Sequence, residues 1–496
     1  MVLLHARLVN KPEGAQRRRH AGLWLACSIA ALLSTGVLFG GAASAETLTQ
    51  ALNGAYKYNP KLDAERARLR ASDEEVPRAL SGYRPTVAAS ADAGVQRSES
   101  KPGSPTSNGE THPSGFNVNA IQPLFRGFRT INTVREAEAL VRAARETLRL
   151  QEQVVLQEAA TAFMDVVRDG SLVRLRENAV AVFTRELKAT QDRFAVGEVT
   201  RTDVAQSEAT RATSVAALDL ARANLKSSRA TYERVIGRPP SNLVDPRLPE
   251  KILPKNVNEV TAIAGQEHPN VGAALYREQA ARHTVDKIWG ELLPTLQLEA
   301  NYTKRFEPSR TTDESETSSL VGRLNVPIYQ GGEVQARVRQ AKQTHVSRLQ
   351  EVEQFRTETV SAAIGFFSQL QATRARLESD RVSVSASQTA LNGVREEEKV
   401  GQRTLLDVLN AEQALLNAQV TLVTDQRDLV VGAYTTLAAI GRLNAEALGL
   451  GSEVYDAEAH YFDVRRKWWG LSITHADGRR ETHDMWDTHG RHLPVK

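Results

Sequence analysis

The chain of 496 residues contains a single cysteine, Cys27, so no disulfide can form within it. Aromatic residues make up only 5% of the sequence, whereas charged residues reach 25%. A thick globular core buries many aromatic side chains, while long exposed helices need few of them. The composition therefore favours long helices.

Beyond residues 1–45, which are discussed below as a leader, the sequence also lacks four common motifs of catalytic and cofactor sites. It contains no P-loop, GxSxG, HExxH or CxxC pattern, and the pair Gly331-Gly332 is too little for a phosphate cradle. The net charge is +4, but Lys and Arg alternate with Asp and Glu, and the one arginine cluster, 17–19, lies in the leader. We therefore expect no enzymatic activity, no cofactor, no metal site and no binding to nucleic acid, which needs a clustered basic patch.

Residues 1–45 have the pattern of a secretory signal peptide. A basic region precedes an apolar run from Leu23 to Phe39, and Ala43-Ser44-Ala45 provides the small residues that a signal peptidase accepts. An uncleaved membrane anchor is the alternative, because the apolar run is long enough for it. A lipoprotein at Cys27 is less favoured, since the apolar run continues past it.

The rest of the chain repeats one plan. The first repeat covers 46–240 and consists of a helical segment broken at Asn59-Pro60, a β-hairpin at 85–124, a long helix at 127–195 and a helix at 200–236. The second repeat covers 257–443, with its hairpin at 294–327, its long helix at 331–399 and its last helix at 403–440. A linker, 241–256, joins the repeats. Residues 444–496 are expected to form a partly disordered tail that is loosely ordered or draped on the surface, because the tail histidines lack the fixed spacing of a tetrahedral metal site.

Both hairpins show the period-two alternation of strands with two different faces. In the first, the strand 87–95 is followed by a polar loop from Ser98 to Ser114 and a strand that ends at Pro123. In the second, the strand 296–303 is followed by an acidic, Ser- and Thr-rich stretch from Glu307 to Ser319, which we expect to be a loop.

The long helices carry apolar residues at seven-residue intervals that are interrupted by a four-residue step. The seven-residue period is that of a left-handed coiled coil, and the four-residue step locally unwinds it. In the first they are Val134, Val141, Leu148, Val155, Ala162, Val166, Val173, Val180, Leu187 and Phe194, and in the second Val338, Val352, Phe366, Leu370, Leu377, Val384 and Leu391. Each long helix ends at a Val-Gly turn, at Gly197 and at Gly401.

Four alternating strands cannot close a barrel, yet a strand edge cannot stay open in lipid. Eight strands leave an interior filled by side chains, so a water-filled lumen favours twelve strands from three chains. Gln297, Glu299, Asn301, Arg323 and Asn325 would then line the lumen, and Leu296, Leu298, Ala300, Leu320 and Leu324 would meet lipid. A soluble hairpin lying on its own helices is the alternative.

The duplicated plan, the Val-Gly turns followed by 202–204 (TDV) and 407–412 (DVLNAE), and the sequence 439–443 (AIGRL) resemble the outer-membrane factor family of TolC. The sequence 407–413 (DVLNAEQ) and the tail segments 460–465 and 468–471 resemble its type I secretion branch. The resemblance implies an α+β fold: a trimeric 12-stranded β-barrel in the outer membrane, continuous with a periplasmic α-helical coiled-coil barrel. It implies an export duct for type I protein secretion or multidrug efflux that works with a periplasmic adaptor and an inner-membrane ABC or proton-driven transporter. A secreted coiled-coil scaffold without a pore is the competing interpretation.

The resemblance also implies a gate at the inner ends of the helices. Arg403 would contact Thr202 and Asp203 of an adjacent chain, Asp407 would ring the constriction, and the turn tips Gly197, Glu198, Gly401 and Gln402 would meet the adaptor. This sequence departs from the family at two positions. Glu398 replaces the latch tyrosine and is expected to repel Asp203, and Asn410 replaces the second carboxylate of the constriction.

Overall fold

The computed structural model describes residues 46–98, 109–246, 248–451, 454–475 and 480–481. The chain divides into the units Met1–Ser44 and Ala45–Lys496, and all described residues belong to the second. The predicted signal peptide and the end of the tail lie outside the described residues. No helix in the described ranges is both long and apolar enough to span a membrane.

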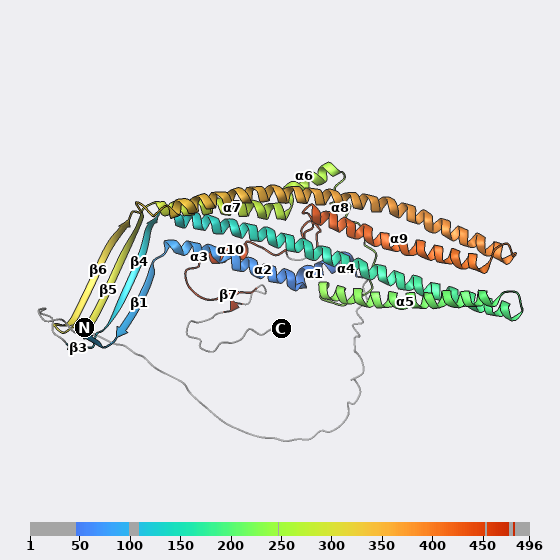
Figure 1. The fold of residues 1–496 in the computed structure, drawn as a ribbon, viewed down its shortest axis with the longest axis horizontal. Helices are drawn as coiled ribbons and strands as arrows, with labels where there is room; N and C mark the ends of the chain where they lie inside the picture. Colours follow the sequence, from blue (N-terminus) through green and yellow to red (C-terminus); the bar gives the residue numbers. More distant parts are fainter. Residues whose placement is uncertain (1–45, 99–108, 247, 452–453, 476–479, 482–496) are drawn as a thin grey trace, which may run out of the picture. The chain divides into compact units, whose positions relative to one another are not determined.

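The described unit contains two successive sets of elements (Figure 1). The first set is α1 (Leu48–Tyr58), α2 (Pro60–Asp73), α3 (Glu75–Leu80), β1 (Thr86–Ala93), β2 (Gln96–Ser98), β3 (Gly109–Thr111), β4 (Ser114–Arg126), α4 (Arg129–Ala195) and α5 (Arg201–Ile236). The second set is α6 (Val257–Glu267), α7 (Pro269–Trp289), β5 (Thr295–Ser309), β6 (Thr312–Asn325), α8 (Glu333–Lys399) and α9 (Leu405–Ala439). After them come α10 (Ala459–Arg465), β7 (Ile473–Thr474) and β8 (Arg480–Glu481).

The break near the start of each repeat is a capped helix start. Asn59 accepts a hydrogen bond from the backbone N–H of Lys61 at 3.0 Å, and proline follows as the first residue of α2. In the second repeat, His268 Nδ1 accepts from the backbone N–H of Asn270 at 3.2 Å, before Pro269 opens α7. Proline suits this position because its missing N–H would have no partner there.

The four long strands form one antiparallel sheet in the order β1-β4-β5-β6. β4 does not end at Pro123, as the sequence suggested, but continues to Arg126 through an irregularity between Pro123 and Phe125. A bulge accommodates the proline, which cannot donate to the ladder. β2, at the start of the expected loop, pairs with β3 inside it to form a small second sheet.

The expectation of a loop over 307–319 is wrong. β5 continues to Ser309 and β6 begins at Thr312. Cross-strand pairs explain the difference, because Lys304 binds Glu314 at 2.6 Å and the Tyr302 hydroxyl donates to Glu316 at 3.2 Å. Such pairs stabilise a sheet even where the composition resembles that of a loop.

α4 and α8 each have 67 residues and pack against α5 and α9 respectively. Gly197 lies in the turn between α4 and α5 at φ +81°, and Gly401 lies in the turn between α8 and α9 at φ +78°, both in the left-handed region. That conformation is strained for other residues.

The seven-residue pattern predicts the buried face of α4 only as far as Val166. Beyond it, the buried apolar side chains are Ala179 and Phe183, whereas Phe194 is 45% exposed. In α8 the buried aromatic residue is Phe367 rather than the predicted Phe366. A strict seven-residue repeat drifts around a straight helix, so the buried side changes along such a length.

The main core lies where the ends of α5 and α9 meet α1, α4 and α8. Its largest buried side chains are Leu52, Phe163, Tyr232, Phe367 and Leu437.

The beginning of the tail is part of this packing, so a segment draped on the helices describes it better than a loosely ordered one. Ala445 and Leu450 are buried in the main core, and α10 packs on α2 and α3. The His460 Nδ1 atom lies 2.9 Å from Asp73 Oδ2, a buried carboxylate of α2. His460, one of the irregularly spaced histidines of the tail, thus helps to pack α10 against α2.

Candidate functional site

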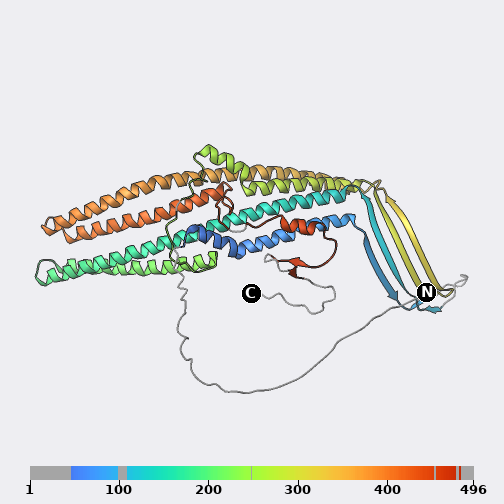
Figure 2. The ribbon, with the colours of Figure 1, turned by 180° about the vertical axis from the view of Figure 1, so that it is seen from behind.

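One face of the four-stranded sheet is apolar. Leu296, Leu298 and Ala300 of β5 lie opposite Leu324, Gly322 and Leu320 of β6. The same face carries Val118 and Ala120 of β4 and Val87 of β1. Leu320, Leu324 and Val87 are each more than 60% exposed. Figures 1 and 2 show that no helix of the described part covers the sheet from either side.

The opposite face is polar. Arg323 binds the carboxylate of Glu299 through Nε at 2.7 Å and Nη2 at 2.9 Å. Gln297 donates to Glu299 at 2.6 Å, and Asn117 donates to Asn301 at 2.7 Å. The structure thus brings together the polar residues that the sequence placed on one face, with Asn325 opposite Thr295 at the end of the ladder.

Both edges of this sheet are open within the chain. β1 pairs only with β4, and β6 pairs only with β5, among the residues that the structure describes. Each edge presents unpaired backbone groups, which in lipid would cost several kcal/mol apiece. The sheet therefore needs further strands wherever water is excluded.

The two helical turns have the same cap. Asp203 accepts from the backbone N–H and the hydroxyl of Thr200, both at 2.8 Å, and Asp407 accepts from Thr404 at 3.0 Å and 2.8 Å. The hydrogen bond from the backbone N–H lowers the pKa of each carboxyl. Both aspartates are therefore ionised at neutral pH.

The other predicted gate residues are accessible. Thr202, Arg403 and Asn410 are exposed, as are the tip residues Gly197, Glu198, Gly401 and Gln402. Within the chain, Arg403 Nε donates to Glu397 at 2.9 Å, a contact that raises the pKa of Arg403. The contact predicted for Arg403, with Thr202 and Asp203 of an adjacent chain, stays a prediction.

Glu398 has a cationic partner that the sequence analysis missed. Arg193 Nη1 of α4 donates to Glu398 Oε1 of α8 at 2.5 Å, and Arg193 also approaches Glu198 at 3.4 Å. The contact with Glu398 raises the pKa of Arg193. This ion pair joins the α4–α5 hairpin to the α8–α9 hairpin close to both turns. Arg193 lies 205 positions before Glu398, so no local spacing could have indicated the pairing.

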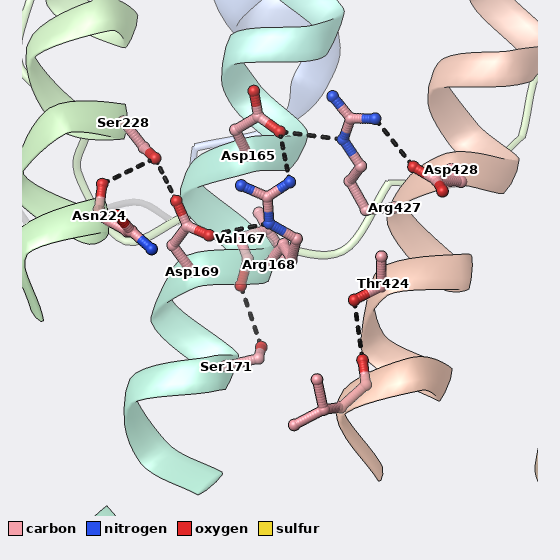
Figure 3. Close-up of polar contacts among 11 residues, drawn as sticks. Asp165, Val167, Arg168, Asp169, Ser171, Asn224, Ser228, Thr424, Arg427 and Asp428 are labelled. Atoms are coloured by element: carbon pink, nitrogen blue, oxygen red, sulfur yellow. Dashed lines mark hydrogen bonds and ion pairs between the residues drawn. The ribbon is translucent and has the colours of Figure 1, made fainter. Parts of the chain in front are cut away.

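A second link between the hairpins lies further from the turns (Figure 3). Arg427 of α9 donates to Asp165 of α4 at 2.9 Å and to Asp428 at 2.8 Å. On α4, Asp165 also pairs with Arg168 at 3.2 Å, and Arg168 binds the buried Asp169 at 2.8 Å. Asp169 accepts in turn from Ser228 of α5, so the network spans three helices. The only sequence signal for it is charge next to the apolar stripe of a long helix.

The model of the outer membrane efflux protein family matches residues 51–238 and 262–441. The chain belongs to this family. The outer membrane efflux protein BepC of Brucella suis is 41% identical over 452 residues, which cover 91% of this chain and 97% of the relative. The outer membrane protein TolC of Escherichia coli is 24% identical, with 83% and 85% covered.

Two further likenesses add detail. The alkaline protease secretion protein AprF of Pseudomonas aeruginosa is 26% identical over 329 residues, covering 65% of this chain and 67% of the relative. The crystal structure of the Campylobacter jejuni CmeC outer membrane channel matches with a TM-score of 0.72 at 16% identity, covering 84% of this chain and 89% of that one. At that identity the match shows the fold alone.

Membership of the outer membrane efflux protein family confirms the resemblance drawn from the repeated plan. The protein is an outer-membrane export channel with a large periplasmic part, and the family is not an enzymatic one. Nothing in the comparisons supports a scaffold without a pore.

Proposed function

We propose that three copies of the chain assemble into a 12-stranded barrel in the outer membrane, with the apolar sheet face toward lipid and the polar face toward the lumen. The observation that carries this proposal is a sheet with an uncovered apolar face and two open edges. Eight strands, from two copies, would leave a lumen filled by side chains. Twelve strands leave room for water and cargo.

Three of the four strands are long enough for a membrane-crossing role, since β4 has 13 residues, whereas β1 with 8 falls just short. A tilted strand needs about 9–11 residues to cross a bilayer, and β5 and β6 have 15 and 14. The apolar face occupies the part of these strands near the helices, whereas Lys304, Glu314 and Glu316 lie toward the far turn. The charged ends extend into water beyond the bilayer.

The helical hairpins continue the duct through the periplasm, and their turns form its gate. In the proposed trimer Arg403 contacts Thr202 and Asp203 of the next copy, while Arg193 and Glu398 hold the two hairpins of one copy together. Glu398 therefore does not weaken the gate by repelling Asp203, because Arg193 neutralises it. Asp407 forms one ring of three carboxylates, and Asn410 leaves a second ring uncharged.

Partners dock at the turns. Glu198 and Gln402 are exposed beside Gly197 and Gly401, and we assign these tips to a periplasmic adaptor that links the duct to an inner-membrane transporter. BepC is named for efflux and AprF for the secretion of an alkaline protease. Both cargo classes, small toxic compounds and proteins, are therefore assigned to this duct.

Cysteine cross-linking between the open sheet edges tests the assembly. Cys27 lies in the leader, so a mature chain carries no cysteine of its own. Pairing a cysteine at Val87 in β1 with one at Leu320, Gly322 or Leu324 in β6 should give dimer and trimer bands after oxidation.

A cysteine at Ala300 of the central strand β5, paired with the one at Val87, is the matched control and should stay monomeric. Trimers as the largest product support the proposal. An open ladder of larger products, or no cross-linking at any edge pair in membranes, refutes it.

A further inference from the structure

The described part of the tail returns to the start of the sheet. Arg84, two residues before β1, donates from Nη1 to the backbone oxygen of Lys467 at 3.1 Å. The Arg84 guanidinium lies over the Trp468 ring, 4.7 Å from its centroid. A hydrogen bond and an ion pair hold the preceding helix α10, because His460 contacts Asp73 at 2.9 Å and Arg465 pairs with Glu138 at 2.7 Å. The tryptophan pair is thus placed at the level where strand β1 begins.

This segment exposes large apolar side chains. Trp468 is 68% exposed, Trp469 82%, Leu471 62% and Ile473 52%. Four exposed apolar side chains within six residues, next to a sheet of this kind, indicate an interaction surface. We call residues 466–473 the tail anchor.

The residues around the tail anchor have the composition of a membrane interface. Trp and Tyr gather where hydrocarbon meets water, since one end of each ring system is polar. All three tryptophans in the described ranges, Trp289, Trp468 and Trp469, lie next to a strand start and are at least half exposed. Phe128 and Tyr329 follow the C-terminal ends of β4 and β6, and they are 59% and 82% exposed.

Cations accompany these rings. Arg466 and Lys467 directly precede Trp468, and Arg84 lies against it. Basic residues beside Trp and Leu form the pattern with which a segment lies in the headgroup layer and attracts anionic lipid. The basic residues and the exposed apolar side chains therefore both indicate that the tail anchor contacts the lipid headgroup layer.

We propose that the tail anchor inserts Trp468, Trp469 and Leu471 into the headgroup layer on the periplasmic side of the outer membrane. It fixes the depth and tilt at which the first strand enters the bilayer. The inference rests on the proposed function in one respect, namely that the four-stranded sheet crosses this membrane.

Fluorescence quenching tests the proposal. The mature chain with Trp289→Phe and Trp486→Phe retains Trp468 and Trp469 as its only tryptophans. It is reconstituted in vesicles of phosphatidylethanolamine and phosphatidylglycerol whose acyl chains are brominated either near the headgroup or near the chain end. We expect a loss of emission that is larger with bromine near the headgroup, and a blue shift relative to the protein in urea.

The matched control places a tryptophan far from the membrane. Phe194→Trp, at the turn end of α4 and 45% exposed, in a chain whose other tryptophans are replaced by phenylalanine, should not be quenched by either lipid. Resistance of the protein to alkaline extraction shows separately that the sheet is inserted.

Each outcome decides the inference. Unquenched Trp468 and Trp469 in a protein that resists extraction overturn the tail anchor and leave the barrel intact. A protein that is extracted refutes the barrel, and the anchor with it. Unquenched rings together with loss of the trimer in Trp468→Ser/Trp469→Ser mean that a second copy covers the patch, which also overturns the proposal.

Discussion

The ion pair between Arg193 and Glu398 offers a direct test of how the gate is held. It joins α4 to α8 near the turns, with side chains that are 42% and 18% exposed. A pair of this exposure contributes about 0.5–1 kcal/mol. Three copies in a trimer would contribute about 2 kcal/mol, which changes the ratio of closed to open gates by roughly 30-fold.

Arg193→Ala and Glu398→Ala should therefore each raise single-channel conductance in planar bilayers and sensitivity of cells to large antibiotics. The double variant should leak about as much as Glu398→Ala, because both lack the same link, and no more than Arg193→Ala, which also leaves Glu398 free to repel Asp203. The exchange Arg193→Glu/Glu398→Arg should restore most of the closure.

A matched control lies on the same hairpin. Arg222 of α5 pairs with Glu177 of α4 at 2.9 Å, with side chains that are 51% and 47% exposed, but both belong to one hairpin. Arg222→Ala should leave conductance unchanged. Single variants as closed as the parent protein, or a leak in the double variant that equals the sum of both, would refute the reasoning.

The other predictions concern the caps and the constriction. Burial lowers the pKa of His268 to about 4 from its ordinary 6.5. The contribution of neutral His268 to the free energy of unfolding is therefore complete above pH 6.5 and is lost as the pH falls toward 4. At pH 5 the loss is about 2 kcal/mol. His268→Asn, the residue at the equivalent cap of the first repeat, should flatten this dependence in urea unfolding followed by circular dichroism; an unchanged slope would contradict it. Asp407→Asn keeps an oxygen for the cap but should abolish channel block by multivalent cations, and Asn410→Asp should strengthen that block; persistent block in the first variant places the cation site elsewhere. Arg403→Ser should raise permeability to large antibiotics, whereas Glu397→Ala, which removes only the partner of Arg403 within the chain, should not; equal leaks would count against a link to the next copy.

Much of the fold could be predicted because its signals are local. Each repeat combines a helix start at Asn-Pro or His-Pro, alternating strands, a long helix without proline and a Val-Gly turn, and each of these patterns acts within about ten residues. The glycines at 197 and 401 fit the left-handed turns, and the polar residues of β5 and β6 share one face as their spacing requires. The wrong loop at 307–319 arose because composition resembled a loop, while cross-strand pairs with Lys304 and Tyr302 decided for strand.

Some residues of the candidate site could likewise be predicted from local patterns, and others could not. Asp203 and Asp407 could be identified from their places in the turns, and their cap hydrogen bonds are local. The partner of Glu398 could not, because Arg193 reaches it only after two long hairpins pack together. The link from Arg427 to Asp165 likewise joins helices far apart in sequence.

The sequence by itself determined the duplicated plan, the two turns and the two faces of the sheet, since periodicity and turn chemistry depend on near neighbours. Only the tertiary structure decided which charges pair across the hairpins, where the buried face of α4 turns beyond Val166, and that the tail lies against the start of the sheet. The physical reason is that these features depend on which surfaces meet. An ion pair such as Arg193–Glu398 acts over a few ångströms in space, whatever the distance along the chain.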